Sequence, residues 1–202
     1  MQLLHIDSSA LGEYSVSRQL TAAIVAAQKS AHPDLQVRYY DLAAEPIAHL
    51  TGAELGVYRG AEATDPALQQ LAAQNEQVMA DFLAADLIVI GAPMYNFSIP
   101  SQLKAWIDRI LVAGKTFRYT ATGPESLIDN KPVIIASTRG GFHGAESPTA
   151  MLDHQERYLT TALNFIGLTN LHFIRAEGLG MPDKRDASVR AALLEIQQLI
   201  LP

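Results

Sequence analysis

The chain has 202 residues, of which 49% are hydrophobic, and a formal net charge of −6. This length predicts a single domain over residues 1–202 with a substantial core, and the apolar content argues against disorder. The negative charge argues against a broad nucleic-acid-binding surface, and the absence of cysteine excludes disulfides, thiolate metal sites and cysteine nucleophiles.

The first half of the chain alternates short apolar runs with helical periodicity. An apolar run at 3–6 predicts the first strand, and a helix follows over 15–32 with apolar residues on one face. The run at 35–40 predicts a second strand, and 41–64 is interpreted as a long connection with one short helix. An Asp-Pro pair then begins a predicted helix over 65–84.

The second half continues the same alternation. The run Leu-Ile-Val-Ile at 87–90 predicts a buried third strand, because it is short, apolar and β-branched. A loop of about twenty residues without regular structure is predicted after the next helix. The remaining predicted elements are a helix at 101–112, a strand at 132–137, a helix at 148–167, a strand at 171–176 and a helix at 186–199.

Apolar strands that alternate with helices predict a parallel sheet covered on both faces. Five such units predict a flavodoxin-like, doubly wound α/β domain with strand order 2-1-3-4-5. The alternative is a Rossmann domain, in which a Gly-x-Gly-x-x-Gly motif follows the first strand. The chain has Asp-Ser-Ser-Ala-Leu-Gly at 7–12 instead, which argues against a dinucleotide bound on that turn.

The loop after the third predicted strand carries the most informative motif, which is Pro93, Met94, Tyr95, Asn96 and Phe97. Ligands of open α/β sheets lie outside the carboxyl ends of the strands, where this loop is expected. Two aromatic rings and an amide suit a flat, hydrogen-bonding ring such as a flavin. Asn96 offers that ring a donor and an acceptor, although a loop asparagine also serves its own backbone in a turn.

The loop after the first predicted strand favours an anion. It is rich in hydroxyl groups and leads into a helix N-terminus, where free N–H groups and the helix dipole attract negative charge. Ser9, Ser15 and Ser17 offer hydroxyl groups, and Arg18 offers a positive charge. Ser15 or Ser17 is equally suited to a plain N-cap, so the loop points to phosphate only together with the neighbouring loops.

The loop after the fourth predicted strand contains two adjacent glycines, Gly140 and Gly141, which follow Thr138 and Arg139. Adjacent glycines let the backbone approach a ligand closely and place N–H donors against the pyrimidine edge of a flavin. His143 either polarises a substrate oxygen or is a solvated loop residue. The six histidines show no metal-ligand spacing, so no metal site is predicted.

The three loop motifs resemble those of the FMN-dependent NADH:azoreductases, also described as NAD(P)H:quinone oxidoreductases. The resemblance covers the full length and includes Thr-Phe-Arg-Tyr-Thr at 116–120, Gly-Pro-Glu at 123–125 and Asn-Phe-Ile-Gly at 164–167. It implies non-covalent FMN with residues 93–97 along the flavin ring and residues 138–141 at its pyrimidine edge. The residues implied to hold the FMN phosphate are Ser9, Ser15, Val16 and Ser17.

The resemblance also implies a homodimer with two active sites at its interface, roofed by aromatic residues of the partner chain. The residues expected to face the substrate are Phe117, Tyr119, Phe142, His143 and Phe165. The expected reaction carries a hydride from NADH or NADPH through flavin N5 to quinones and aromatic azo compounds in a ping-pong order. No catalytic side chain is predicted, because the flavin carries the chemistry.

Two other functions are compatible with the predicted fold. An electron-carrier flavodoxin needs a concentrated acidic surface, whereas the charges here are dispersed along the chain. A regulatory α/β domain without enzymatic activity has no need of the loop at 93–97. The sequence starts without a signal-like segment and no apolar run reaches membrane-spanning length, so a cytoplasmic protein without membrane or nucleic-acid partners is expected.

Overall fold

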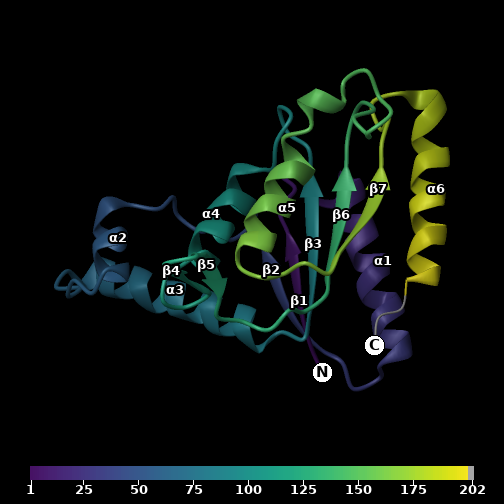
Figure 1. Ribbon diagram of the computed structural model, residues 1–202. Helices are drawn as coiled ribbons and strands as arrows, with labels where there is room; N and C mark the ends of the chain where they lie inside the picture. The colour runs from purple at the N-terminus through teal and green to yellow at the C-terminus, as the bar shows by residue number, and fades with distance from the viewer. Residues whose placement is uncertain (200–202) are drawn as a thin grey trace.

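Residues 1–199 are described by a computed structural model of the chain, and five strands form one parallel sheet (Figure 1). The strands lie in the order β2-β1-β3-β6-β7. Their bounds are β1 Gln2–Asp7, β2 Gln36–Asp41, β3 Leu87–Pro93, β6 Val133–Thr138 and β7 Leu171–Ala176. Numbered among themselves in chain order, these five strands have the predicted order 2-1-3-4-5, so the expected topology is confirmed.

Helices cover both faces of this sheet (Figure 1). The helices α1 (Val16–Ala31) and α6 (Pro182–Gln198) pack against each other on one face. The opposite face carries α3 (Pro66–Ala84), α4 (Ser101–Ile110) and α5 (Gln155–Phe165). The predicted two-sided cover of a parallel sheet is therefore confirmed.

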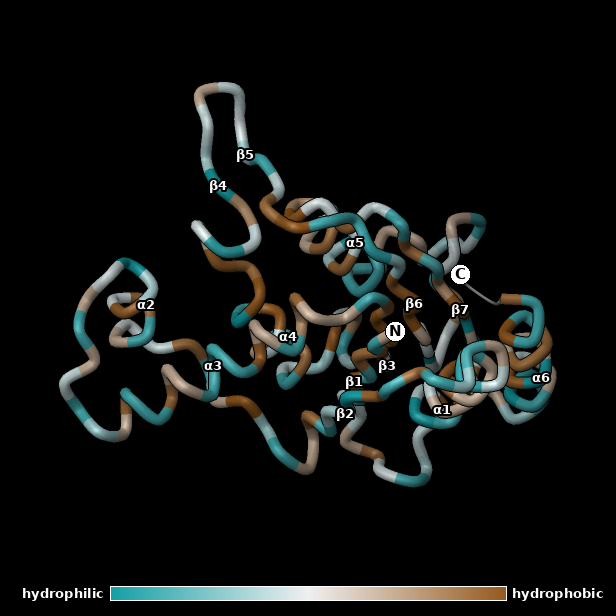
Figure 2. Tube along the Cα trace, turned by 90° about the horizontal axis from the view of Figure 1, so that it is seen from below, coloured by the Kyte–Doolittle hydropathy of each residue, from teal (hydrophilic) through white to brown (hydrophobic). Residues whose placement is uncertain are grey.

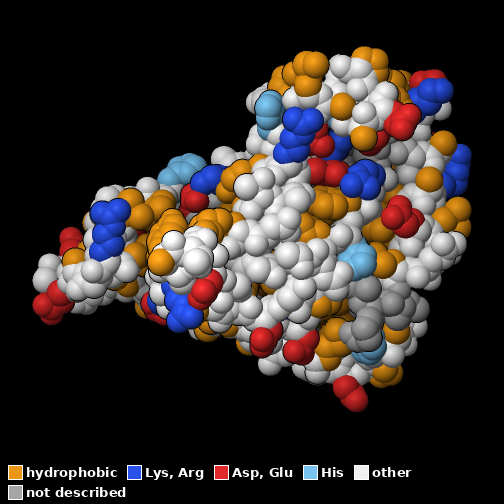
Figure 3. Space-filling model, in the orientation of Figure 1, with side chains coloured by type: hydrophobic (Ala, Val, Ile, Leu, Met, Phe, Trp, Pro, Cys, Tyr) orange, Lys and Arg blue, Asp and Glu red, His pale blue; other side chains and the backbone are white. Residues whose placement is uncertain are grey.

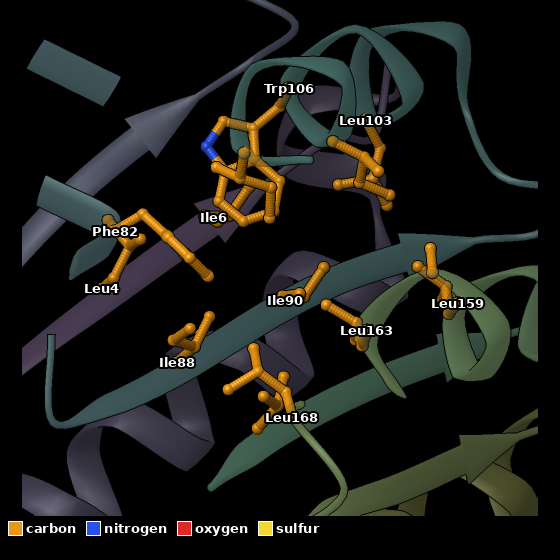
Figure 4. Close-up of a cluster of buried hydrophobic side chains, with 14 of the residues drawn as sticks. Leu4, Ile6, Phe82, Ile88, Ile90, Leu103, Trp106, Leu159, Leu163 and Leu168 are labelled. Atoms are coloured by element: carbon orange, nitrogen blue, oxygen red, sulfur yellow. The ribbon is translucent and has the colours of Figure 1, made fainter. Parts of the chain in front are cut away.

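Alternate residues of the buried strands enter two separate hydrophobic cores. Leu3 packs in the core on the side of α1 and α6, whereas Leu4 packs in the core on the side of α3, α4 and α5. Figure 4 shows this second core, where Phe82 lies edge-on to Trp106 with ring centroids 6.0 Å apart. Each fully buried leucine or isoleucine side chain stabilises the fold by about 1.5–3 kcal/mol, so the apolar strand runs hold the three layers together.

The carboxyl ends of the parallel strands lie at one edge of the sheet, and the strand register brings three loops together there. Asp7 at the end of β1 pairs with Gly91, and Pro93 at the end of β3 pairs with Thr138 at the end of β6. A Cβ atom on Gly91 would lie 2.7 Å from Oδ1 of Asp7, so any side chain at this position would displace the Asp7 carboxylate.

A β-hairpin occupies part of the region that was predicted to be a loop. It consists of β4 (Phe117–Thr120) and β5 (Gly123–Ser126), which pair antiparallel. The hairpin projects from the rest of the chain (Figure 2). Strands this short show too little alternation of apolar and polar residues for the pattern to be recognised in sequence.

Two helices begin at other residues than predicted. Helix α5 begins at Gln155 rather than residue 148, with His154 as its N-cap. Asp153, one residue before the N-cap, accepts hydrogen bonds from the first two N–H groups of the helix, those of Gln155 and Glu156. Helix α6 begins at Pro182 rather than residue 186, with proline in its first turn. The short helix predicted in the connection after β2 is confirmed as α2 (Gly52–Tyr58).

Candidate active site

A cavity of about 230 Å³ lies at the carboxyl edge of the sheet, between the loops that follow β1, β3, β6 and β7. Nine of the thirteen predicted cofactor-binding residues line it, and the other four, Ser17, Asn96, Phe97 and Gly141, are close to them in the chain. The lining residues are Ser9, Leu11, Tyr14, Ser15, Val16, Pro93, Met94, Tyr95, Thr138, Arg139, Gly140, Leu179, Gly180 and Arg185.

The N-terminus of α1 presents unpaired backbone donors at this cavity. Ser15 is the N-cap, and its Oγ accepts a hydrogen bond from the backbone N–H of Arg18 and lies 3.0 Å from Oγ of Ser17. Within the described residues, the backbone N–H groups of Val16 and Ser17 have no acceptor. Two free donors at a positive helix end suit an anion, so the N-cap and anion-site interpretations of Ser15 are compatible.

Arg18 does not offer a free charge to this anion site, in contrast to the expectation from sequence. Its guanidinium donates to both carboxylate oxygens of Asp41, at 2.6 and 2.7 Å, and to the backbone carbonyl of Ser9 at 3.0 Å. The hydrogen bond from Arg18 lowers the pKa of Asp41 to about 2. Arg18 therefore anchors the serine loop to β2, and the positive end of the site is the backbone of α1.

The loop after β3 forms a tight two-residue turn. Tyr95 and Ser98 exchange both of their backbone hydrogen bonds, and Asn96 and Phe97 between them have φ angles of 47° and 71°. Positive φ at both central residues defines a type I′ turn, which asparagine tolerates and phenylalanine rarely adopts. The side chain of Asn96 is exposed and makes no hydrogen bond within the described residues, so its amide is available to a ligand.

The loop after β6 is aligned by a ladder of hydrogen bonds with the loop after β7. The carbonyl groups of Arg139, Gly140 and Gly141 accept from the N–H groups of Leu179, Gly180 and Gly178, at 3.0, 2.9 and 2.9 Å. This ladder uses the carbonyl groups, and the N–H groups of Gly140 and Gly141 have no acceptor in the part of the chain that the structure describes. Gly140 lines the cavity, so this strip of backbone offers hydrogen-bond donors to a ligand.

Five of the residues that line the cavity were not predicted from the sequence. Leu179, Gly180 and Arg185 come from the region after β7, and Leu11 and Tyr14 come from the loop after β1. The loop after β7 enters the site because β7 is the neighbour of β6 in the sheet, and its Gly-Leu-Gly sequence at 178–180 was the available signal. Leu11 and Tyr14 are 58% and 88% exposed, so both present large apolar surfaces beside the cavity.

One chain does not bring the five predicted substrate-facing residues together. Phe142 follows β6, and the His143 ring lies edge-on to Phe97 with centroids 6.2 Å apart. Phe117 instead packs against Tyr119 and Phe165, at 5.4 and 4.7 Å between centroids.

The pair of Phe97 and His143 lies near one end of α5, and the group around Phe117 lies near the other end. Gln155 in its first turn hydrogen-bonds the carbonyl of Ala92 near the carboxyl edge, and Phe165 follows ten residues later, about 15 Å along the helix. Phe117 is only 7% exposed and belongs to the core, which leaves it little surface for a substrate. Phe142 and His143 follow Gly141 in the chain, but neither lines this cavity, and His143 lines a separate recess beside α5.

The residues that the structure describes contain no group of three or more histidine, aspartate or glutamate side chains suited to a metal ion. Among residues 1–199, no helix has the length and apolar character needed to cross a membrane.

Comparisons with known proteins match this architecture along nearly the whole chain. Residues 1–200 match a protein family described by its flavodoxin-like fold. An FMN-dependent NADH:quinone oxidoreductase of Sinorhizobium fredii is 58% identical over 90% of this chain and 87% of its own length, and one of Azospirillum brasilense is 52% identical over 100% and 99%. A crystal structure of an azoreductase from Bacillus anthracis has a TM-score of 0.88 at 30% identity and covers 98% of this chain and 97% of its own. The chain therefore belongs to the flavodoxin-like family of FMN-dependent NADH:quinone oxidoreductases and azoreductases.

Proposed function

We propose that this chain is an FMN-dependent oxidoreductase that carries a hydride from NADH to quinones and aromatic azo compounds. The observation that supports this most strongly is the pair of donor arrays at one cavity. Free N–H groups of Val16 and Ser17 lie at a helix N-terminus, and free N–H groups of Gly140 and Gly141 lie on the loop after β6. The relatives named for quinone and azo reduction support the choice of acceptors.

The residues present fit a non-covalently bound FMN. Ser9, Ser15 and Ser17 with the first turn of α1 would hold the phosphate, as expected of a helix N-terminus. The residues at 93–97 would line the ring, and the backbone at 138–141 would face its pyrimidine edge. The single described anion site matches a mononucleotide, and we propose that residues 1–202 form one FMN-binding domain.

FMN held at this site would supply the hydride-transfer chemistry between NADH and an acceptor. The chain itself binds and orients the cofactor. The N–H groups of Gly140 and Gly141 would stabilise negative charge at the pyrimidine edge, in the way that backbone donors stabilise an oxyanion. No side chain need act as a nucleophile, so we propose that NADH and acceptor use the same cavity in turn, in a ping-pong order.

We propose further that two chains form a homodimer that completes the active sites. Tyr119 on the β4–β5 hairpin is 73% exposed, and hydrophobic side chains gather over this hairpin in Figure 3. Since Phe117, Tyr119 and Phe165 lie away from the cavity of their own chain, the roof of each site would come from the partner's hairpin. Sedimentation velocity at assay concentration tests this, and a fully active monomer would refute it.

The absorption spectrum of the purified protein tests the proposed function directly. A visible flavin band is expected, and the chromophore released by heat should have the mass of FMN rather than FAD. NADH added without oxygen should bleach the band, and a quinone should restore it. A protein that binds no flavin under these conditions, or whose flavin NADH does not bleach, would rule the proposal out.

A further inference from the structure

The guanidinium of Arg139 is fully enclosed although it lies next to the candidate active site. Only 1% of its side chain is exposed, and it separates the cavity from a larger recess of about 790 Å³ beside α5. Charged side chains are visible over this region in Figure 3. The side chains that surround the guanidinium form the Arg139 cluster, which consists of Arg139, Asp153, Gln155, Glu156 and Glu177.

Each of the three nitrogen atoms of the Arg139 guanidinium contacts at least one side-chain oxygen. Its Nε donates to Oε1 of Gln155 at 3.0 Å, and Nη1 lies 3.2 Å from Oε1 of Glu177. Its Nη2 lies 2.9 Å from Asp153 and 2.6 Å from Glu156. The side chain of Arg139, the first residue after β6, therefore holds both the start of α5 and the loop after β7.

The cluster extends directly to the backbone that lines the cavity. Glu177 accepts a hydrogen bond from the backbone N–H of His143 at 2.7 Å, which fixes the far end of the Gly140-Gly141 loop. Gln155 donates to the carbonyl of Ala92 and accepts from Oγ of Ser137, so it ties the end of β3 to the end of β6. Two of the loops expected to contact the flavin are held by this one group.

The charges around Arg139 exclude the role of attracting an anionic ligand by its positive charge. Three carboxylates surround its guanidinium, and the only further cation paired with them among the described residues is Arg175, which binds Glu156. The cluster as a whole is therefore negative and cannot attract an anionic ligand. What the guanidinium contributes is geometry, because five fixed N–H donors define the positions of the groups around them.

We propose that Arg139 is a positioning residue for the bound flavin, and that its buried guanidinium fixes the loop whose Gly140 and Gly141 N–H groups face the pyrimidine edge. The inference rests on the proposed function. It explains why a charged side chain is buried beside the cavity without entering it. It also explains why the carbonyl groups of residues 139–141 all pair with the loop after β7, which Glu177 holds in place.

Arg139→Lys tests this role, because lysine keeps the charge but not the planar fork. The holoenzyme of each variant is compared with the wild type in three measurements: FMN dissociation by ultrafiltration, midpoint potential of the bound flavin, and thermal unfolding. We expect about tenfold weaker FMN binding and a more negative potential for Arg139→Lys. If the variant loses tenfold more affinity for reduced than for oxidised FMN, the midpoint potential of the bound flavin falls by about 30 mV for the two-electron couple.

Arg38→Lys is the matched control. Arg38 forms an ion pair with Asp81 on the other edge of the sheet, and its side chain is 58% exposed. The Arg38→Lys substitution should leave FMN affinity and the midpoint potential of the bound flavin unchanged. If Arg139→Lys retains the affinity and potential of the wild type, the positioning role is refuted, whereas a wild-type protein without FMN refutes the proposed function instead.

Glu177→Ala decides the question if the Arg139 variant does not fold. This change removes the ties to Arg139 and to His143 N–H at a partly exposed side chain. Positioning predicts weaker FMN binding and a more negative potential, because the N–H donors lose their alignment. A purely electrostatic cluster predicts the opposite sign, since a negative charge is removed, and a rise in potential would overturn the inference.

Discussion

The hydroxyl oxygen of Tyr95 lies 3.0 Å from Oγ of Ser9, although 86 positions separate the two residues in the chain. The same oxygen accepts a hydrogen bond from the backbone N–H of Ala10 at 3.2 Å. Because β1 and β3 are neighbours in the sheet, this contact connects the serine loop to the turn that contains Asn96. Tyr95 therefore couples the expected phosphate end of the cofactor site to its ring end.

Tyr95→Phe should weaken FMN binding by about 0.5–1.5 kcal/mol, the usual net contribution of one hydrogen bond, because the serine loop loses its tie to β3. Quenching of FMN fluorescence during titration of the apoprotein measures this. Tyr158→Phe is the matched control, since the Tyr158 hydroxyl makes no hydrogen bond within the described residues. Equal affinities for the two variants would show that the Tyr95 contact does not shape the site.

Ser17→Ala should weaken FMN binding by about 1–3 kcal/mol, the cost of a hydrogen bond lost to a charged group. Riboflavin lacks the phosphate, so its affinity should not change. Ser15→Ala should also lower the stability of the apoprotein by about 1 kcal/mol, because Ser15 caps α1. A Ser101→Ala variant at the start of α4 controls for a serine at another helix start. An equal loss for riboflavin and FMN would contradict a phosphate site.

Asn96→Gly separates the two roles that the sequence allows for this residue. Glycine adopts the φ of 47° without strain, so the apoprotein should keep or raise its melting temperature. If the amide binds the flavin, FMN affinity and the rate of flavin reduction by NADH should both fall. Asn96→Ala, by contrast, should destabilise the apoprotein by about 1–2 kcal/mol, because alanine disfavours left-handed backbone. Unchanged flavin reduction in the glycine variant would leave Asn96 with a turn role only.

Phe97→Gly should relieve backbone strain at φ 71° and raise the stability of the apoprotein by about 1 kcal/mol. The same change removes a ring that is 48% exposed and lies edge-on to His143. Stopped-flow reduction of a quinone should therefore slow while urea unfolding shifts to higher concentration. A destabilised variant would mean that contacts of the ring outweigh the strain.

Asp41→Asn should lower the stability of the apoprotein at pH 7 by about 2 kcal/mol, because the pKa of Asp41 is about 2 in the folded chain and ordinarily 3.8. A depressed carboxyl pKa stabilises the fold above the ordinary value, and this contribution disappears as the pH falls through the folded value. The difference between wild type and variant should thus shrink from pH 4 to pH 2 in urea unfolding measured at each pH. A difference independent of pH would refute the ion pair with Arg18.

Local sequence patterns determined most of the fold. The apolar runs at β1, β3 and β6 predicted buried strands because each run is short and followed by turn residues, and the runs at β3 and β6 are also rich in β-branched residues. Parallel pairing then placed the loops at 8–17, 93–97 and 138–141 at one edge, so their convergence followed from sequence alone. Residue types inside those loops were sufficient to predict the kind of ligand.

Only the tertiary structure decided what the charged and aromatic side chains do. Arg18 looked available for a phosphate, but its partner Asp41 lies 23 positions away and meets it only because β2 pairs with β1. The guanidinium of Arg139 is likewise occupied by Glu177, 38 positions away. Phe117 and Phe142 share an aromatic character that the sequence could not assign to different ends of the molecule. Hydrogen bonds and ring contacts between distant segments leave no periodicity in the chain, so they depend on the folded arrangement of the strands.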